Sequence, residues 1–117
     1  MNKYTELSDF QINLLVAQFV LPDTQYDVIK QTMDIIQFLV DGSFGYRFFD
    51  PCNNPTDAMP IIIENLISLM ADMSDGREST WWCASDISNS FTSNYKSNPL
   101  RAAMEVFLMI KDAENEG

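Results

Sequence analysis

The clearest pattern of hydrophobic and polar positions lies near the N-terminus, where apolar residues recur every three or four positions from Ile12 to Phe19. Ser8 and Gln11 precede this run at the spacing of a capping box, in which each side chain bonds the backbone amide of the other. Pro22 stops the pattern. A helix is therefore predicted from Ser8 to the residues before Pro22, with a buried stripe of Ile12, Leu15, Val16 and Phe19.

An asparagine followed by proline, a typical helix start, opens two more segments at Asn54-Pro55 and Asn98-Pro99. Pro60 lies inside the first segment and predicts a bent or 3₁₀-like first turn. After the second helix, residues 113–117 form an acidic tail that we expect to fray. The expected buried stripes are Met59, Ile62, Ile63 and Leu66 in the first helix, and Leu100, Ala103, Met104, Phe107 and Leu108 in the second.

Alternating apolar and polar positions predict an antiparallel hairpin in the second half of the chain. Residues 67–73 read as a half-buried strand, residues 74–78 carry an Asp-Gly turn signal, and residues 80–87 read as the second strand. The polar run 88–97 predicts a loop. A short aromatic strand is predicted over residues 46–49.

Residues 24–40 fit two patterns. On a helical wheel their apolar side chains share one side and their charged side chains the other, which favours an amphipathic helix capped by Thr24. The many β-branched residues, with Asp41-Gly42 after them, are instead typical of strands joined by turns. The pattern alone favours the helix.

The composition fits one folded domain. The chain has 117 residues, of which 46% are hydrophobic and 12% aromatic, so residues 1–117 can bury a core as a single compact unit. Together with the elements above, this predicts an α+β fold in which about three helices pack on a small antiparallel sheet. The longest apolar runs are too short to span a membrane, and the N-terminus lacks a signal region, so we expect a cytoplasmic protein.

The charge excludes some classes of partner. Seventeen acidic and seven basic residues give a net charge of −10, and the basic residues do not cluster. A negative surface repels phosphate, which argues against binding of nucleic acid or anionic membranes. The acidic surface could instead imitate DNA toward a host nuclease or DNA-binding protein. Solubility alone also explains such a charge.

The chemistry for catalysis is sparse. The chain contains no histidine, which removes His-centred triads, proton shuttles and His-bound metals. No nucleophile elbow, Ser-x-x-Lys pair or phosphate-binding glycine loop is present. We expect Cys52 and Cys83 to remain two reduced thiols, too few for structural zinc. The sequence therefore predicts no enzyme, no metal site and no cofactor.

Three segments resemble a known family. Leu7-Ser8-Asp9-Phe10-Gln11-Ile12-Asn13, Asn53-Asn54-Pro55-Thr56-Asp57-Ala58-Met59-Pro60-Ile61-Ile62 and Asn98-Pro99-Leu100-Arg101-Ala102-Ala103-Met104 are similar to the NinX-like family of small phage and prophage proteins. The resemblance spans about residues 7–110, with Met59 where tryptophan would be expected. It implies an alpha-beta-alpha sandwich and, for residues 24–40, hairpin strands rather than a helix.

The resemblance implies no activity, but it does imply a phage accessory protein in the cytoplasm of an infected bacterium. We therefore expect non-catalytic binding of a host or phage protein, and the aromatic surplus also allows a homodimer. The alternatives are DNA mimicry and a module that binds a small ligand through Arg47, Arg77 or Arg101. Helices could instead bury both adjacent tryptophans in the core. The candidate partner-binding residues are Trp81, Trp82, Phe91, Tyr95, Tyr46, Asp72, Asp75 and Asp86.

Overall fold

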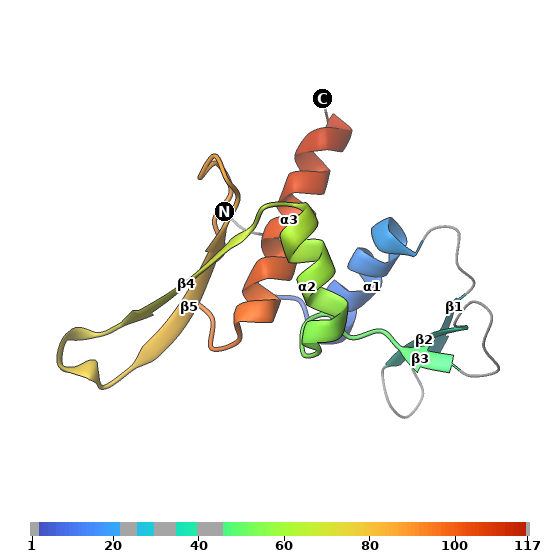
Figure 1. The fold of residues 1–117 in the computed structure, drawn as a ribbon, viewed down its shortest axis with the longest axis horizontal. Coiled ribbons are helices and arrows are strands. Elements are labelled where there is room, and N and C mark those ends of the chain that lie inside the picture. The colour runs from blue at the N-terminus through green and yellow to red at the C-terminus, as the bar shows by residue number, and fades with distance from the viewer. Residues whose placement is uncertain (1–2, 22–25, 30–34, 40–45, 117) are drawn as a thin grey trace.

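The fold is that of a computed structural model, which describes residues 3–21, 26–29, 35–39 and 46–116. Three helices form its centre: α1 (Asp9–Val20), α2 (Pro55–Glu64) and α3 (Pro99–Glu116) (Figure 1). Helix α3 packs against α1, against α2 and against the two strands that lie between α2 and α3 in the sequence. Residues 101–108 are all buried, so this helix is the core of the molecule. None of the helices in the described ranges combines the length and the apolar character that crossing a membrane needs.

The strands form two antiparallel sheets. β1 (Tyr26–Ile29), β2 (Ile35–Leu39) and β3 (Tyr46–Phe48) make one sheet, and β4 (Ser68–Met73) and β5 (Thr80–Ser85) make a hairpin. The two sheets lie at opposite ends of the molecule with the helices between them (Figure 1). The α+β class with three helices is confirmed, although the strands divide into two sheets where one was expected.

The helix favoured by the pattern of residues 24–40 is wrong, and the strands implied by the family resemblance are correct. Tyr26 pairs with Phe38 and Ile29 with Ile35 in an antiparallel register. β-branched side chains fit a pleated strand better than a helix, which explains the outcome. The Asp41-Gly42 turn signal lies outside the described residues.

The predicted helix starts are confirmed. Ser8 Oγ accepts the Gln11 N–H at 3.1 Å, and the Gln11 side chain accepts the Ser8 N–H at 2.8 Å. Asn54 Oδ1 accepts the Thr56 N–H at 3.0 Å, and Asn98 Oδ1 accepts the Leu100 N–H at 2.9 Å. Helix α3 runs through Glu116, so the predicted acidic tail is mostly helical.

The predicted buried stripe of α2 is wrong in three of its four residues. Met59, Ile63 and Leu66 are exposed, and the buried residues are Asp57, Ala58, Ile61 and Ile62. Three consecutive isoleucines make two neighbouring faces of the helix apolar, so the pattern alone could not choose between them. The Asp57 carboxylate accepts the Asp50 N–H at 3.0 Å and turns that face inward.

The hairpin of β4 and β5 is confirmed, but β4 is not half-buried. Only Leu69 in this strand packs against the core, because the hairpin contacts the helices at its base, where Ala84 is buried, and its tip projects beyond them (Figure 1). We call residues 68–85 the hairpin arm. The accessible surface is 7482 Å², above the roughly 6,500 Å² expected of a compact monomer of this mass.

Candidate functional site: a polar cluster and an apolar groove

The three segments that carry the family resemblance meet inside the molecule. They supply most of a set of bonded polar side chains at the starts of α1, α2 and α3. We call this set the polar cluster; its members are Asp9, Asn13, Asp50, Asn53, Lys96, Asn98, Arg101 and Glu105.

Arg101 is the centre of the polar cluster. Its Nε lies 2.7 Å from the Glu105 carboxylate, and its Nη1 lies 2.7 Å from Asp9 Oδ1. Its Nη2 donates to the carbonyl oxygens of Tyr4 at 3.0 Å and Leu7 at 2.6 Å. Four of the five guanidinium N–H donors are therefore used inside the protein.

Both cations of the cluster are paired with carboxylates. Glu105 is fully buried and also contacts Lys96, whose Nζ lies 3.3 Å from the carboxylate. Burial alone would lower the pKa of Arg101, but hydrogen bonds from its guanidinium to Asp9 and Glu105 outweigh burial and raise it. The Lys96 ammonium donates further to Thr5 Oγ1 at 2.6 Å. Both cations thus hold the N-terminal segment against α3.

Neutral side chains extend the cluster toward α2. Asn13 donates to Asp50 Oδ1 at 2.7 Å and accepts the Cys52 N–H at 3.1 Å. Asn98 donates to the Cys52 carbonyl at 2.6 Å. Burial first, and then the charge of Asp9, raises the pKa of the Cys52 thiol well above its usual range. This cysteine is therefore an inert packing residue.

A hollow of about 380 Å³ opens over the cluster between Thr5, Asn53, Lys96 and Arg101. It is the site at which a small polar ligand would be sought. The donors of Arg101 and Lys96 around it already bond protein acceptors, so a ligand would have to displace those bonds. The cluster therefore serves chiefly to hold the three helices together.

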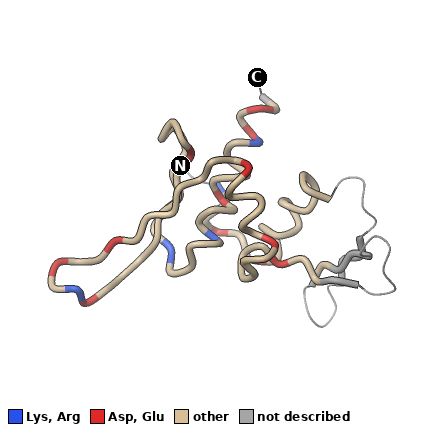
Figure 2. The backbone as a smooth tube through the Cα atoms, viewed as in Figure 1, with Lys and Arg blue, Asp and Glu red and all other residues tan. Residues whose placement is uncertain are grey.

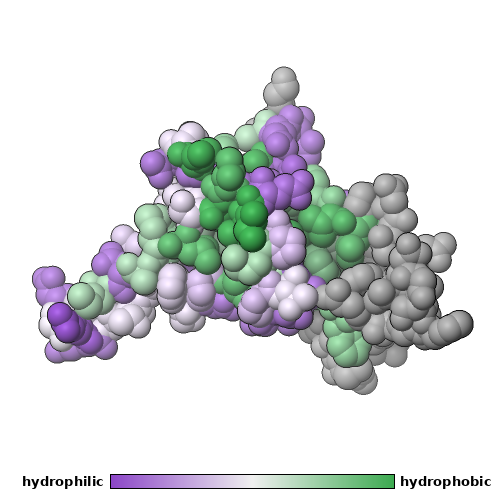
Figure 3. Space-filling model, viewed as in Figure 1, coloured by the Kyte–Doolittle hydropathy of each residue, from purple (hydrophilic) through white to green (hydrophobic). Residues whose placement is uncertain are grey.

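The exposed face of α2 presents a different surface. An open hollow of about 590 Å³ separates α2 from the base of the hairpin arm, and Figure 3 shows a continuous hydrophobic patch there. Ile63 is 66% exposed and Ile87 is 72% exposed. We call this surface the apolar groove; it is lined by Met59, Ile62, Ile63, Leu66, Ile67, Ser68, Leu69 and Ile87. Such a patch is typical of a protein-binding site.

Leu66, on the groove, has an unusual backbone. Its φ is 55°, in the left-handed region, and the N–H of Ile67 bonds the Ile62 carbonyl at 3.0 Å. This is a Schellman helix end, in which glycine usually occupies the position of Leu66. A leucine there costs about 1 kcal/mol, and its side chain is 58% exposed. This cost is therefore not offset by burial of the side chain in the core.

The hairpin arm carries the predicted aromatic candidates. Trp81 and Trp82 are half-buried on opposite faces of β5, and neither belongs to the core, so burial of both rings under helices is not observed. Tyr95 is 67% exposed and lies with its ring centroid 5.3 Å from that of Trp81. A shallow hollow of about 430 Å³ lies beside both tryptophans.

The other candidates are dispersed. Asp72 and Asp75 are exposed on the arm, whereas Asp86 is buried and accepts hydrogen bonds from the Ser88 hydroxyl and then the Phe91 N–H, which lower its pKa. Phe91 is half-buried against the core. Tyr46 lies in β3, but its side chain is outside the described set.

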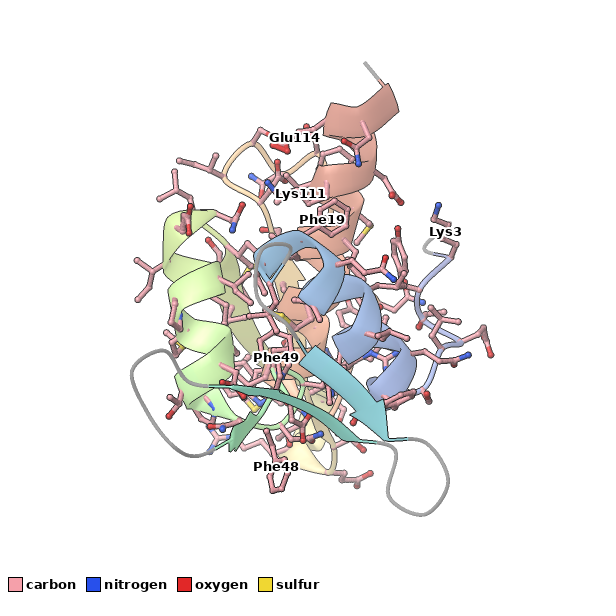
Figure 4. The ribbon with its side chains drawn as sticks, turned by 90° about the vertical axis from the view of Figure 1, so that its right-hand side faces the viewer. Lys3, Phe19, Phe48, Phe49, Lys111 and Glu114 are labelled. Atoms are coloured by element: carbon pink, nitrogen blue, oxygen red, sulfur yellow. The ribbon has the colours of Figure 1, made fainter. Side chains whose placement is uncertain are left out.

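The aromatic residues after Tyr46 point in different directions. Phe49 is buried toward the helices, and Phe48 is 60% exposed and points away from them (Figure 4). The same view shows Lys111 beside Glu114 near the end of α3, where their charges lie 3.2 Å apart.

Sequence reasoning missed the groove as a site. It assigned Met59, Ile63 and Leu66 to the core. The signal was the number of apolar residues in α2. A single buried face of this helix cannot hold all of them. Ile87 gave no signal, because it was predicted as the last residue of the strand 80–87, whereas β5 ends at Ser85 and leaves it exposed.

The charges offer no alternative site of equal clarity. The carboxylates of the described residues are spread over the arm, α2 and the end of α3, with no continuous run (Figure 2). Among these same residues, no three His, Cys, Asp or Glu side chains gather in a way that could hold a metal ion.

One family of known proteins matches the chain. The family described as Bacteriophage P22, NinX matches residues 3–111, which is most of the sequence. No curated protein matches, and no solved structure matches.

Proposed function

The chain belongs to the family of the bacteriophage P22 protein NinX, and on that premise we propose that it is a phage accessory protein that modulates a host protein by non-catalytic binding. Its place of action would be the cytoplasm of the infected bacterium. The observation that carries this proposal is the apolar groove, in which Ile63, Leu66 and Ile87 remain mostly in water. Burial of these side chains by a partner would be favourable.

Two further observations support binding over catalysis or ligand sequestration. The polar cluster uses its cations within the protein, so it is suited to hold the helices rather than a substrate. The exposed side chain of Leu66, at a position with a strained backbone, supports its use in contact with a partner.

The test is affinity purification from a lysate of infected bacteria. Wild-type protein is compared with Ile63→Ser in the groove and with Phe48→Ser, a control that removes an equally exposed apolar side chain at the opposite end of the molecule. We expect one host protein in stoichiometric amount with wild type and Phe48→Ser, and its loss with Ile63→Ser. Absence of any such protein, or equal losses with both variants, would contradict the proposal.

The same purification distinguishes an apolar contact from DNA mimicry. Contact through the groove should hold between about 0.1 and 0.5 M salt, because apolar burial is not screened by ions. Mimicry through carboxylates would lose its partner as salt rises. A steep loss for wild type would therefore overturn the groove as the main contact.

A further inference from the structure

The two edges of the hairpin arm differ. The backbone of Trp82 exchanges hydrogen bonds with Lys96, at 2.6 and 2.8 Å, and the Ala84 carbonyl accepts the Ser93 N–H at 2.9 Å. Residues 92–96 therefore cover the outer side of β5. No described segment pairs with the outer side of β4.

The register shows which groups of β4 are left open. In an antiparallel pair, successive residues bond alternately to one side and the other. Because Trp82 and Ala84 bond away from β4, their register partners Ala71 and Leu69 direct their own N–H and C=O groups outward. The same alternation places the Met73 N–H outward, and that group donates to Asp72 Oδ1 at 2.8 Å. The open stretch of the edge is therefore Leu69 to Ala71.

This open stretch adjoins the apolar groove. The Leu69 side chain lines the groove, and the preceding residues Ile67 and Leu66 continue the groove to the end of α2. A strand placed along Leu69 and Ala71 would have one row of its side chains facing the exposed residues of α2. The groove and the edge are thus two parts of one surface.

We propose that the partner binds by adding an extended segment to the β4 edge, opposite Leu69 and Ala71, with its alternate apolar side chains in the groove. This inference rests on the proposed function and specifies its partner. The partner segment carries basic residues, because the exposed carboxylates of Glu64 and Asp72 adjoin the surface in the chain, beside Ile63 and Ala71.

A second copy of the chain fits this surface less well. Each copy carries a net charge of −10. Pairing of two β4 edges would bring together two molecules of that charge. Repulsion between like-charged molecules disfavours that pairing. The occupant is therefore a different protein.

The edge is tested first in the free protein by amide hydrogen exchange. The amides of Leu69 and Ala71 should exchange at least about tenfold faster than those of Met70 and Asp72, which bond to β5. Binding of the captured host protein should slow Leu69 and Ala71 by a similar factor. Equal exchange of all four amides in the free protein, or no slowing in the complex, would overturn strand addition.

The second test uses two proline variants of the arm. Ala71→Pro removes an N–H that points outward from the open edge of β4. Thr80→Pro removes an N–H of β5 that points away from β4, at the opposite edge of the hairpin. Neither change breaks a bond between β4 and β5. We expect Ala71→Pro to weaken capture by about tenfold and Thr80→Pro to leave it unchanged.

The outcomes separate the two proposals. If Ile63→Ser abolishes capture but Ala71→Pro does not, the partner binds the groove in another form, such as a helix, and strand addition is wrong while the proposed function stands. If wild type captures no host protein, both proposals fail. If wild type is a dimer and Ala71→Pro a monomer in sedimentation, the occupant is a second copy and our assignment is wrong.

Discussion

In the polar cluster each charged side chain has a partner within the protein, whereas in the apolar groove large hydrophobic side chains remain in water. Arg101 alone makes four bonds to neighbouring groups. Ile63, near the C-terminal end of α2, is 66% exposed. The difference separates two tasks: the cluster fixes the helices relative to one another, and the groove is left for another molecule.

The segments that resemble the family belong more to the polar cluster than to the apolar groove. They contain most of the polar cluster, since Asp9, Asn53, Asn98 and Arg101 all lie in them. The residues by which the family is recognised are therefore mainly those that join the three helices. The surface proposed to bind a partner consists mainly of isoleucine, leucine and methionine, which carry little identifying pattern.

The largest expected effect comes from breaking the cluster. Arg101→Met should lower the free energy of unfolding by about 3 kcal/mol, because the buried Glu105 carboxylate loses its main partner. Urea denaturation measures this loss. Arg77→Met, at the exposed tip of the arm, is the matched control and should change stability by less than about 0.5 kcal/mol. Similar losses in both variants would mean that the cluster has no special structural role.

The two cysteines report on the two regions by their reactivity. Cys52 lies in the buried region of the cluster, where burial raises the pKa of its thiol, and Cys83 lies on the partly exposed arm. A thiol reagent at neutral pH should modify Cys83 at least about a hundredfold faster than Cys52. The reagent can reach Cys52 only when the buried region of the protein opens. Mass spectrometry of the modified sites measures the ratio. Comparable rates would show that the cluster opens as readily as the arm.

At the groove, stability and binding should change in opposite directions. Leu66→Gly should raise the free energy of unfolding by about 1 kcal/mol, because glycine adopts a positive φ without strain. The same variant should bind the host partner more weakly. Thermal denaturation and affinity purification measure the two effects. A variant that is less stable, or that binds as wild type does, would contradict a functional reason for this leucine.

The smallest effect concerns a charge near the surface. The hydrogen bond from the Tyr4 hydroxyl, followed by that from Lys3, lowers the pKa of Asp112 despite the opposing effect of burial. A carboxyl group with a lowered pKa contributes stability that is present above its unfolded pKa and is lost as pH falls through the folded value. Asp112→Asn should therefore reduce stability at neutral pH by less than about 0.5 kcal/mol.

This reduction should vanish at the acid end of a series of denaturation curves, where wild type has also lost the charge. A variant whose deficit stayed constant to low pH would indicate lost packing rather than a lost charge.

The sequence predicted local features well and orientation poorly. Ser8, Asn54 and Asn98 marked the helix starts because capping depends on neighbouring residues. The buried face of α2 could not be predicted, because the bond from Asp50 to Asp57 that turns the helix depends on the folded chain. Likewise, alternation in residues 67–73 predicted a strand, but not that most of this strand would project past the helices.

The same limit applied to the candidate site. Trp81, Trp82 and Tyr95 were predicted from their side chains alone; the structure places the rings of Trp81 and Tyr95 in contact and Trp82 on the opposite face of β5. The open edge of β4 has no sequence signal at all, because it depends on which segments cover the neighbouring strand.

The central position of α3 determines when the protein can fold. This helix follows the other described elements in chain order, and it supplies eight consecutive buried residues from Arg101 to Leu108. Arg101 must then join Asp9, which lies 92 residues earlier in the chain. Such long-range closure is slow compared with the formation of local helices. Until α3 has joined them, the apolar faces of α1 and α2 that it covers stay open to water, and an open core of this kind is prone to aggregation.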